Sequence, residues 1–442
     1  MADLKPAALR IFRETFAAID IPGAIHRKLA RARSHIQVDD ALLDLAGFDR
    51  ICAIAIGKAS IALARGLSEI LSPDFSVEGI IVAPHVLRDS SSNNSPAGFR
   101  VIFAGHPVPD EGSLAAGRAI LELLATTGER TLLFFLLSGG GSVMVEQPLD
   151  PAIGLADLQD LNRWLVTCGA SIDEINAVRK HLSAVKGGRL AVAAAAARKV
   201  TLAITDVPEG KESALASGPT LPDPTTVADA CGVVSQYGLL AKLPARIRMQ
   251  FEHPETIPET PKPGHLAFRD AAFQILLGRH DLSHPAHRAA EEVGFSAVCD
   301  NSTDDWPVEA AADFLLKQLA ALKRDNPSRP VAVIAGGEVS SPVRGDGVGG
   351  RNSAFVLHCV NAIAGQRIAV LSVGTDGIDG GSPAAGAVAD GETLARAHAL
   401  QLDPGDYFQR SDSYTFFHKL DDAIVTGSTG NNLRDLRVLL AE

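Results

Sequence analysis

The stretch TLLFFLLSGGGS, residues 131–142, joins a nearly continuous apolar run to a run of glycines. An apolar run of this length that ends in turn residues is typical of a β-strand buried on both faces. Similar runs follow this pattern elsewhere in the chain, at residues 51–56, 79–83, 200–205, 331–335 and 368–373. We therefore predict a strand at each of these positions.

Alanine-rich stretches alternate with these runs, and their spacing predicts helices over residues 113–126, 157–168 and 309–324. Strands that alternate with helices form parallel sheets covered by helices on both faces. The sequence therefore predicts the α/β class.

A proline-rich segment divides the chain, with five prolines between residues 244 and 263. Because proline fixes φ and lacks an N–H donor, we expect no regular helix or central strand there. This predicts an N-terminal Rossmann-like α/β domain over residues 1–245, a linker over 246–264 and a smaller C-terminal α/β domain over 265–442.

Composition excludes several classes of protein. The chain has 442 residues, of which 46% are hydrophobic and 21% charged, as in globular rather than disordered proteins. The 41 basic and 52 acidic residues give a net charge of −11, which argues against a general binder of nucleic acid or of anionic membranes.

Cysteine usage and the N-terminus predict a cytoplasmic protein. The five cysteines lie far apart without a CxxC pair, which favours reduced thiols over disulfides or a zinc site. Charged residues interrupt the first 20 positions, a pattern that predicts an amphipathic helix rather than a signal peptide. The apolar runs are too short to cross a bilayer.

The predicted strands end in residues suited to chemistry. Lys58 follows the run 51–56, the glycine turn 138–142 follows the apolar run 131–137, and acidic residues follow three more runs: Asp206, Glu338 and Asp376. In open parallel sheets, ligands bind beyond the carboxyl ends of the strands. These residues are therefore our candidates for a functional site.

Phosphoryl transfer is the chemistry that this set would support. Glycines without Cβ atoms let successive backbone N–H groups converge on an anion, and a lysine can neutralise a transferring phosphoryl group. Carboxylates can hold Mg²⁺ and accept a hydroxyl proton. The alternatives are a plain tight turn at 138–142, a solvated lysine at Lys58, and aspartates that cap helices. We expect Asp379 to have a capping role in part.

A second glycine run, residues 345–350, satisfies the pattern GxGxxG. About nine residues separate it from its strand, whereas a dinucleotide fingerprint needs a tight strand-to-helix turn. We interpret it as a mobile or phosphate-approaching loop that leads to Arg351 at a helix start. The chain contains no GxxxxGK[ST], which excludes a P-loop kinase.

A polar stripe at helical spacing lies within residues 171–189: Asn176, Arg179, Lys180 and Ser183. A solvated helix face and a functional face explain this stripe equally well. His106, in a proline-rich turn, is a weaker catalytic candidate.

Taken together, the motifs resemble those of the class II glycerate kinases, whose C-terminal part is called the MOFRL domain. The matching stretches are residues 54–59, 105–112, 137–142, 175–188, 216–226, 349–352, 374–380 and 384–390, with a looser match at 426–432. The resemblance implies two α/β domains with the active site in the cleft between them. It also implies ATP- and Mg²⁺-dependent phosphorylation of D-glycerate at its 2-hydroxyl, which gives 2-phosphoglycerate and ADP.

The residues expected to carry this reaction fall into four groups. The catalytic group is Lys58, Arg351 and Asp206, of which Lys58 and Arg351 are implied by the resemblance as key cations. The nucleotide- and phosphate-binding group is Ser138, Gly139, Gly140, Gly141, Ser142, Gly349, Gly350 and Asn352. The substrate-binding group is Lys58, Arg179 and Arg351. The metal-binding group is Asp206, Glu338 and Asp376. We expect small-molecule partners, D-glycerate and ATP, without nucleic acid or membrane; a homodimer is compatible with the sequence.

Some positions depart from the family pattern, including Lys211, Pro383 and the region 278–287. They leave open a kinase that acts on another short hydroxy acid. An NAD(P)H-dependent hydroxypyruvate reductase and a two-domain small-molecule binding protein also stay open.

Overall fold

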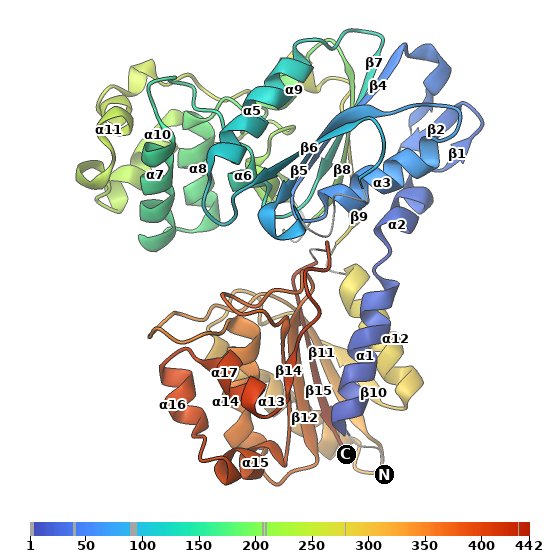
Figure 1. Cartoon of the computed structure of the whole chain (residues 1–442), viewed down its shortest axis with the longest axis vertical. Coiled ribbons are helices and arrows are strands. Elements are labelled where there is room, and N and C mark those ends of the chain that lie inside the picture. Colours follow the sequence, from blue (N-terminus) through green and yellow to red (C-terminus); the bar gives the residue numbers. More distant parts are fainter. Residues whose placement is uncertain are drawn as a thin grey trace. The chain divides into compact units, whose positions relative to one another are not determined.

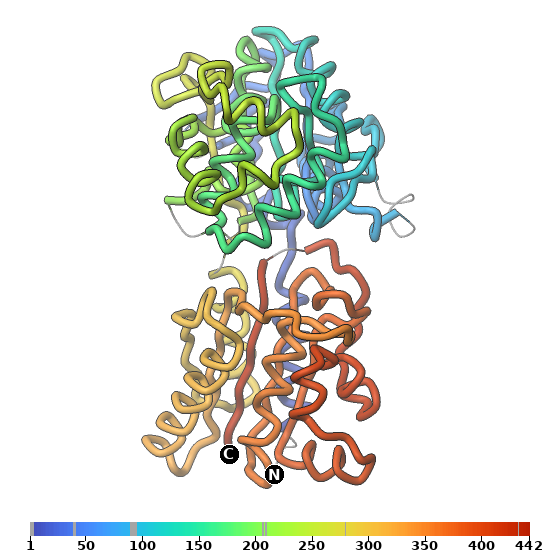
Figure 2. Tube along the Cα trace, turned by 90° about the vertical axis from the view of Figure 1, so that its left-hand side faces the viewer, coloured from blue at the N-terminus to red at the C-terminus, as the bar shows by residue number. Residues whose placement is uncertain are grey.

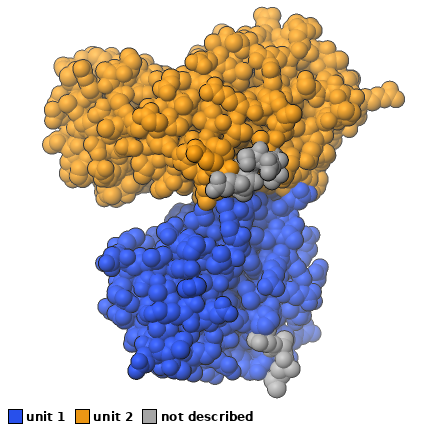
Figure 3. Space-filling model, viewed as in Figure 1, with its two compact units in different colours: residues 1–20, 277–442 blue, residues 21–276 orange. Residues whose placement is uncertain are grey.

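The computed structural model describes residues 4–38, 41–88, 95–205, 207, 210–278, 280–431 and 433–442. The chain forms two compact units (Figure 3). Unit 1 combines the residues up to Asp20 with Leu277–Glu442, and unit 2 is Ile21–Leu276. These bounds differ from the expected division at residues 245 and 265 in two ways: the first helix belongs to unit 1, and residues 246–276 belong to unit 2.

Unit 2 is built on a six-stranded sheet with the order β6-β5-β4-β7-β8-β9. Its strands are β4 (Arg50–Ile56), β5 (Glu78–Pro84), β6 (Phe99–Ala104), β7 (Thr131–Leu137), β8 (Arg198–Ile204) and β9 (Ala272–Leu277). The pairings from β6 through β8 are parallel, as the sequence predicted. All seven residues of β7 are buried, which explains its continuous apolar run.

Helices cover both faces of this sheet (Figure 1). Helices α5 and α9 pack against the face of β4 that carries Cys52, Ile54 and Ile56, and α3 lies on the other side. The helices of unit 2 are α2 (Ile21–Lys28), α3 (Ser60–Leu71), α5 (Glu111–Leu124), α6 (Gly141–Met144), α7 (Leu155–Thr167), α8 (Ile172–Leu182), α9 (Arg189–Ala193), α10 (Val227–Gln236) and α11 (Ala245–Glu252). A small antiparallel sheet adds β1 (Arg31–Ala32), β2 (His35–Val38) and β3 (Ala41–Asp44).

The proline-rich segment 246–264 is part of unit 2. It contains most of α11, whose Ile247 and Phe251 are buried in a core shared with α7, α8 and α10. The expectation that no regular helix forms here was wrong. Pro244 immediately precedes α11 and Pro254 follows it, and prolines at helix ends cost the helix no hydrogen bond.

Unit 1 contains a second six-stranded sheet, with the order β10-β11-β15-β12-β13-β14. Its strands are β10 (Ser296–Cys299), β11 (Val331–Gly337), β12 (Ile368–Gly374), β13 (Gly386–Asp390), β14 (Ala423–Ile424) and β15 (Asp435–Ala441). The expectation of a parallel sheet was wrong for this unit: β10 and β11 pair in parallel, whereas β15 lies antiparallel to both β11 and β12. The C-terminal strand β15, which the sequence analysis did not identify, lies between β11 and β12. These two strands therefore do not pair with each other.

Helices cover both faces of the second sheet as well. They are α1 (Leu4–Ala18), α12 (His280–Val293), α13 (Val308–Asp325), α14 (Arg351–Ile363), α15 (Thr393–Ala399), α16 (Pro404–Gln409) and α17 (Ser413–Lys419). The predicted amphipathic helix at the N-terminus is confirmed as α1. It contacts α12, β12 and β15, and its blue trace lies among the yellow to red elements of unit 1 (Figure 2). Across the described ranges, we find no helix long and apolar enough to cross a membrane.

The buried strand β7 provides a test of the core. Replacing Phe135, which is fully buried, with alanine should lower the free energy of unfolding by about 3–5 kcal/mol, because the cavity would lie in the middle of the sheet. Leu42→Ala is the control, since Leu42 is 63% exposed and its loss should cost less than about 0.5 kcal/mol. Urea unfolding followed by circular dichroism measures both, and equal effects would contradict this packing.

Candidate functional site

In unit 2, the ends of β4 and β7 are joined by backbone and side-chain hydrogen bonds. The two strands are neighbours, with Ile56 opposite Leu137. The backbone N–H of Lys58 donates to the carbonyl of Gly139 at 3.0 Å, and the Ser138 Oγ accepts from the backbone N–H of Ala59 at 3.0 Å. The structure therefore brings Lys58 and the glycine turn together at one edge of the sheet.

This close approach requires glycine at position 57. Gly57 has a φ of +118°, and a Cβ there would lie 2.3 Å from the Ser138 Oγ. Gly140, with a φ of +86°, faces the ring of His106: a Cβ on Gly140 would lie 3.3 Å from the His106 Nε2. The turn is thus shaped by positions that exclude side chains, and His106 lies beside it.

The far end of the turn is tied to α8 through a strained segment. The Ser142 Oγ lies 2.6 Å from the Ser217 Oγ, and the Ser217 hydroxyl donates to the Asn176 Oδ1 at 2.8 Å. Ala216 and Ser217 both have a positive φ, at 50° and 59°, a conformation that is costly for residues other than glycine. Sequence reasoning missed Ser217, and Asn176 entered only as part of the polar stripe.

The polar stripe on α8 is not a solvated face. Asn176, Lys180 and Ser183 are each no more than 3% exposed. Lys180 donates to the Asp223 carboxylate at 3.0 Å. Arg179 donates to the Asn162 Oδ1, and burial lowers the pKa of its guanidinium below the usual range. The stripe therefore connects buried groups within unit 2.

The sequence analysis singled out two further positions in unit 2, Asp206 and Lys211. Asp206, the expected catalytic and metal-binding carboxylate, lies outside the described residues. Lys211, one of the departures from the family pattern, is half exposed and pairs with Asp173 on α8.

In unit 1, Arg351 is held by two carboxylates. Its Nε and Nη2 contact the two oxygens of Asp435 at 2.6 and 3.1 Å, and its Nη1 donates to the Glu338 Oε2 at 2.7 Å. Burial alone would lower the pKa of Arg351, but these carboxylates outweigh it and hold that pKa above its usual range. The partners of Arg351 that the structure shows are protein carboxylates, and its expected contact with a substrate or phosphate anion stays a prediction.

The antiparallel strand β15 explains this arrangement. Asp435, its first residue, lies opposite both Gly337 on β11 and Gly374 on β12. Glu338 and Asp376 therefore follow the two strands that flank Asp435. Sequence reasoning missed Asp435; the available signal was a charged residue just before the mostly apolar run 436–441, which Arg437 interrupts.

A second layer of charged residues supports the same strand ends. The Arg437 Nη2 donates to the carbonyls of Gly336 and Gly337 at 2.7 and 3.0 Å, and burial lowers the pKa of Arg437 to about 10. The Asp304 carboxylate, which pairs with Arg434, accepts the backbone N–H of Glu338 at 2.9 Å. The backbone at Glu338 is thus fixed from two sides.

The N-terminus of α14 is capped by a distant aspartate. The Asp379 carboxylate accepts the backbone N–H groups of Asn352 and Ser353, each at 2.8 Å, and the Ser353 hydroxyl at 2.5 Å. The predicted capping role of Asp379 is confirmed. These two N–H groups serve Asp379 in this structure rather than a phosphate, and the Asn352 Oδ1 accepts from the Ser372 hydroxyl at 2.6 Å.

The glycine loop 345–350 is bound to the segment before α17. Gly347 N–H donates to the Arg410 carbonyl at 3.1 Å, Val348 N–H donates to the Asp412 Oδ1 at 3.0 Å, and the Val348 carbonyl accepts from Tyr414 N–H at 3.0 Å. A Cβ on Gly349 would lie 2.2 Å from the Ser413 Oγ. In this structure the loop is therefore held by hydrogen bonds to residues 410–414, and its interpretation as a mobile or phosphate-approaching loop stays a prediction.

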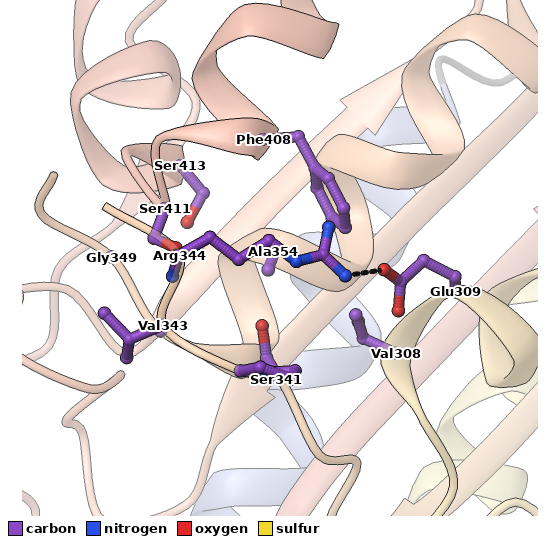
Figure 4. Close-up of a pocket in the computed structure, with 12 residues that line it drawn as sticks. Val308, Glu309, Ser341, Val343, Arg344, Gly349, Ala354, Phe408, Ser411 and Ser413 are labelled. Atoms are coloured by element: carbon purple, nitrogen blue, oxygen red, sulfur yellow. Dashed lines mark hydrogen bonds and ion pairs between the residues drawn. The ribbon is translucent and has the colours of Figure 1, made fainter. Parts of the chain in front are cut away.

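Gly349 and Gly350 line a pocket of about 40 Å³ (Figure 4). Arg344 crosses this pocket, with its guanidinium 5.4 Å from the centre of the Phe408 ring and its Nη2 2.5 Å from the Glu309 Oε1. The other lining residues that Figure 4 labels are Val308, Ser341, Val343, Ala354, Ser411 and Ser413.

Two of the three expected metal ligands, Glu338 and Asp376, lie in the part of the chain that the structure describes. Over the ranges that the structure describes, no group of three or more His, Cys, Asp or Glu side chains is placed to hold a metal ion. Glu338 binds Arg351, and the Asp376 Oδ1 accepts the backbone N–H of Ile378 at 3.1 Å. Mg²⁺ in phosphoryl transfer is usually held by one or two carboxylates together with phosphates and water, so carboxylates of the type of Glu338 and Asp376 have the chemistry that this ion requires.

The buried Asp379 predicts an unusual dependence of stability on pH. Burial raises its pKa to about 6, against 3.8 for an ordinary aspartate, although the bonds from Ser353 and Asn352 oppose the shift. The folded state therefore binds this proton more tightly than the unfolded state, so ionisation of Asp379 lowers the free energy of unfolding at pH 7, and this cost falls as the pH falls towards 4.

Asp379→Asn removes this titration and keeps a similar shape. We expect the free energy of unfolding of the wild type, minus that of the variant, to rise by on the order of 1–3 kcal/mol between pH 7 and pH 4.5. Urea unfolding at several pH values measures the difference, in which other titrating groups cancel. A difference that stays constant, or falls towards acid pH, would contradict the assignment.

Comparisons with known proteins give the family. Residues 7–252 match the family described as "Domain of unknown function (DUF4147)", and residues 331–435 match the MOFRL family. D-glycerate 2-kinase from Thermotoga maritima is 34% identical over 98% of this chain and 97% of its own length. A protein of Agrobacterium vitis that bears the provisional name of hydroxypyruvate reductase is 36% identical over 88% of this chain and 87% of its own length.

A solved structure agrees with this assignment. The crystal structure of glycerate kinase from Thermotoga maritima matches with a TM-score of 0.81 and 33% identity, over 99% of each chain. The match extends across both units, from the parallel sheet to the sheet with the antiparallel C-terminal strand. The chain therefore belongs to the family of proteins that combine a DUF4147 domain with a MOFRL domain.

Proposed function

We propose that this protein is a glycerate 2-kinase, which transfers the γ-phosphoryl group of ATP to the 2-hydroxyl of D-glycerate and releases 2-phosphoglycerate and ADP. The observation that carries the proposal is that hydrogen bonds hold the backbone at Lys58 beside the glycine turn, where the neighbouring strands β4 and β7 end. The names of the family members with the same two domains support it, since they include D-glycerate 2-kinase and glycerate kinase.

In unit 2, the proposed role is to bind anionic oxygens. Lys58 would neutralise charge on the substrate or the transferring phosphoryl group, and the turn 138–142 would direct backbone N–H groups to phosphate oxygens. Arg179 would contribute a further cation for the substrate. The strained Ser217 supports this role, because such strain persists where surrounding contacts hold it and is often found at functional sites.

In unit 1, Arg351 is the proposed second cation of the reaction, with Gly349, Gly350 and Asn352 near the nucleotide. Asp435 holds the guanidinium in one orientation, which reduces the entropy lost when it binds a ligand.

The proposed chemical step needs a base and a metal. The 2-hydroxyl oxygen of glycerate would attack the γ-phosphorus as the bond to the bridging oxygen of ADP breaks, and the hydroxyl proton would pass to Asp206. Asp206, Glu338 and Asp376 are the proposed ligands of Mg²⁺. Bound Mg²⁺ would neutralise charge on the phosphate oxygens.

We also propose the cytoplasm as the compartment; a homodimer stays a prediction.

Two competing functions can be distinguished by experiment. The names of the Agrobacterium relatives favour a hydroxypyruvate reductase. Against it, the run 345–350 is separated from β11 and is anchored to residues 410–414, which is unlike the tight strand-to-helix turn of a dinucleotide fingerprint. The second competing function is a kinase for another short hydroxy acid.

An omission experiment tests the proposal. Purified protein with ATP, Mg²⁺ and D-glycerate should release ADP, and omission of any one should stop the release. The product should be accepted directly by enolase. NADH oxidation with hydroxypyruvate in the absence of ATP would instead indicate the reductase, and ADP release with a different hydroxy acid would indicate a kinase for that acid.

Lys58→Ala tests the proposed role of the cation. We expect a loss of about 10³-fold or more in kcat/KM, since an interaction with the transferring group would be removed. Lys242→Ala is the matched control, because Lys242 is an exposed lysine of the same unit that stacks on Trp164. Thermal unfolding should be similar for both variants, and an unchanged rate in Lys58→Ala would refute the assignment.

A further inference from the structure

The region 278–287 departs from the family pattern, and the proposed function does not use it. It contains His280 and His284, and among the 13 histidines of the chain no other two lie four positions apart. Both belong to α12, which begins at His280. Because residues four apart are neighbours on the surface of a helix, the two imidazoles share one face of α12.

This face of α12 does not contribute to the core of unit 1. Figure 1 shows α12 beside α1, with which it is in contact. His280 and His284 are both exposed. The buried residues of the helix lie on another face: Leu282, Ser283, Ala286, Ala289 and Ala290. Packing therefore does not explain the two histidines, and exposed rings can rotate without displacing their neighbours.

The distance between the two rings suits a shared metal ion. Their centroids are 5.4 Å apart, and their planes are inclined by 31°. With a metal–nitrogen distance of about 2.1 Å, a metal ion lies about 3.2 Å from the centre of each ligating ring, so two rings on one tetrahedral ion have centres about 5.2 Å apart. Coordination therefore requires little more than a rotation of each ring that brings one of its nitrogens to the shared position.

The third histidine of α12 is already engaged. The His287 Nε2 donates to the carbonyl of Ala297 at 3.0 Å, and its Nδ1 lies 3.6 Å from the Glu291 carboxylate. Across the residues that the structure describes, no third His, Cys, Asp or Glu completes a metal-binding group with the pair. Water would fill the remaining coordination positions, so the site would be open and its ion exchangeable.

The surrounding charges favour an ion that bonds to nitrogen over one attracted mainly by charge. The N-terminal end of a helix carries a partial positive charge, and the exposed Arg288 follows His284 by about one turn. Asp281, in the first turn, opposes both with its negative charge. Imidazole suits Zn²⁺, Ni²⁺ and Cu²⁺, whereas Mg²⁺ prefers oxygen ligands.

We propose that His280 and His284 form a binding site for a divalent transition-metal ion that prefers nitrogen ligands, of the class of Ni²⁺ and Zn²⁺. The bound ion links the first two turns of α12 and stabilises the start of this helix. The site contains none of the residues proposed for phosphoryl transfer, so it does not depend on the proposed function.

Calorimetric titration of the untagged, full-length protein with Ni²⁺ tests the site. Ni²⁺ is the probe, because the thiolate of the exposed Cys299 would compete for Zn²⁺. We expect one equivalent to bind to the wild type. His280→Gln and His284→Gln should each weaken binding by about 10-fold or more, because a single imidazole then holds the ion. Circular dichroism of both variants should match the wild type, since the two positions are exposed.

His398→Gln is the matched control. His398 is also exposed and lies on α15 of the same unit, without a histidine four positions away. This variant should bind Ni²⁺ as the wild type does. Equal weakening in all three variants would reduce the binding to unspecific contact with surface histidines and overturn the proposal.

The remaining outcomes are also decisive. Excess Mg²⁺ should leave the bound Ni²⁺ in place, and displacement would contradict a site made of nitrogen ligands. Ni²⁺ should raise the midpoint of thermal unfolding of the wild type but not of His280→Gln or His284→Gln, because an ion that binds the folded chain stabilises it. Absence of binding, weakening in only one of these two variants, or an unchanged midpoint in the wild type overturns the proposal.

Discussion

The ion pair between Arg351 and Asp435 is the interaction on which the site in unit 1 depends. Asp435 begins the central strand β15 and is buried between the ends of β11 and β12. A buried carboxylate needs a charged partner, and the guanidinium of Arg351 supplies one with matching bidentate geometry. The first residue of α14 is thereby fixed to the middle of the sheet, and Glu338, the residue after β11, contacts the same guanidinium.

In unit 2, a steric constraint has the corresponding role. The ends of β4 and β7 approach so closely that position 57 accommodates no side chain, and the hydroxyl of Ser138 bridges the two strand ends. This approach gives Lys58 a defined place beside the glycine turn. Ser142, Ser217 and Asn176 extend the same network to α8, so that the turn is supported from the strands and from a helix.

Both units therefore place polar chemistry at strand ends and support it with buried polar groups. Such networks are costly unless their members are satisfied, and they hold functional side chains more rigidly than loops alone. The family shares this two-unit construction, as the match to a glycerate kinase structure over the whole chain indicates. A phosphotransferase needs preoriented charges of this kind, because most of its catalysis comes from positioning and electrostatic stabilisation.

The sequence by itself determined the positions of the main strands and helices, the glycine turn beside Lys58 and the family. These follow from local patterns: apolar runs that end in glycine or charged residues, and helical spacing between them. Only the tertiary structure decided the antiparallel insertion of β15, the incorporation of the proline-rich segment into unit 2 and the partners of Arg351. Arg351 and Asp435 are 84 residues apart, and Asp379 caps a helix that begins 28 residues before it. Pairings over such separations depend on sheet order and on the burial of individual charges, which a local pattern of residues does not encode.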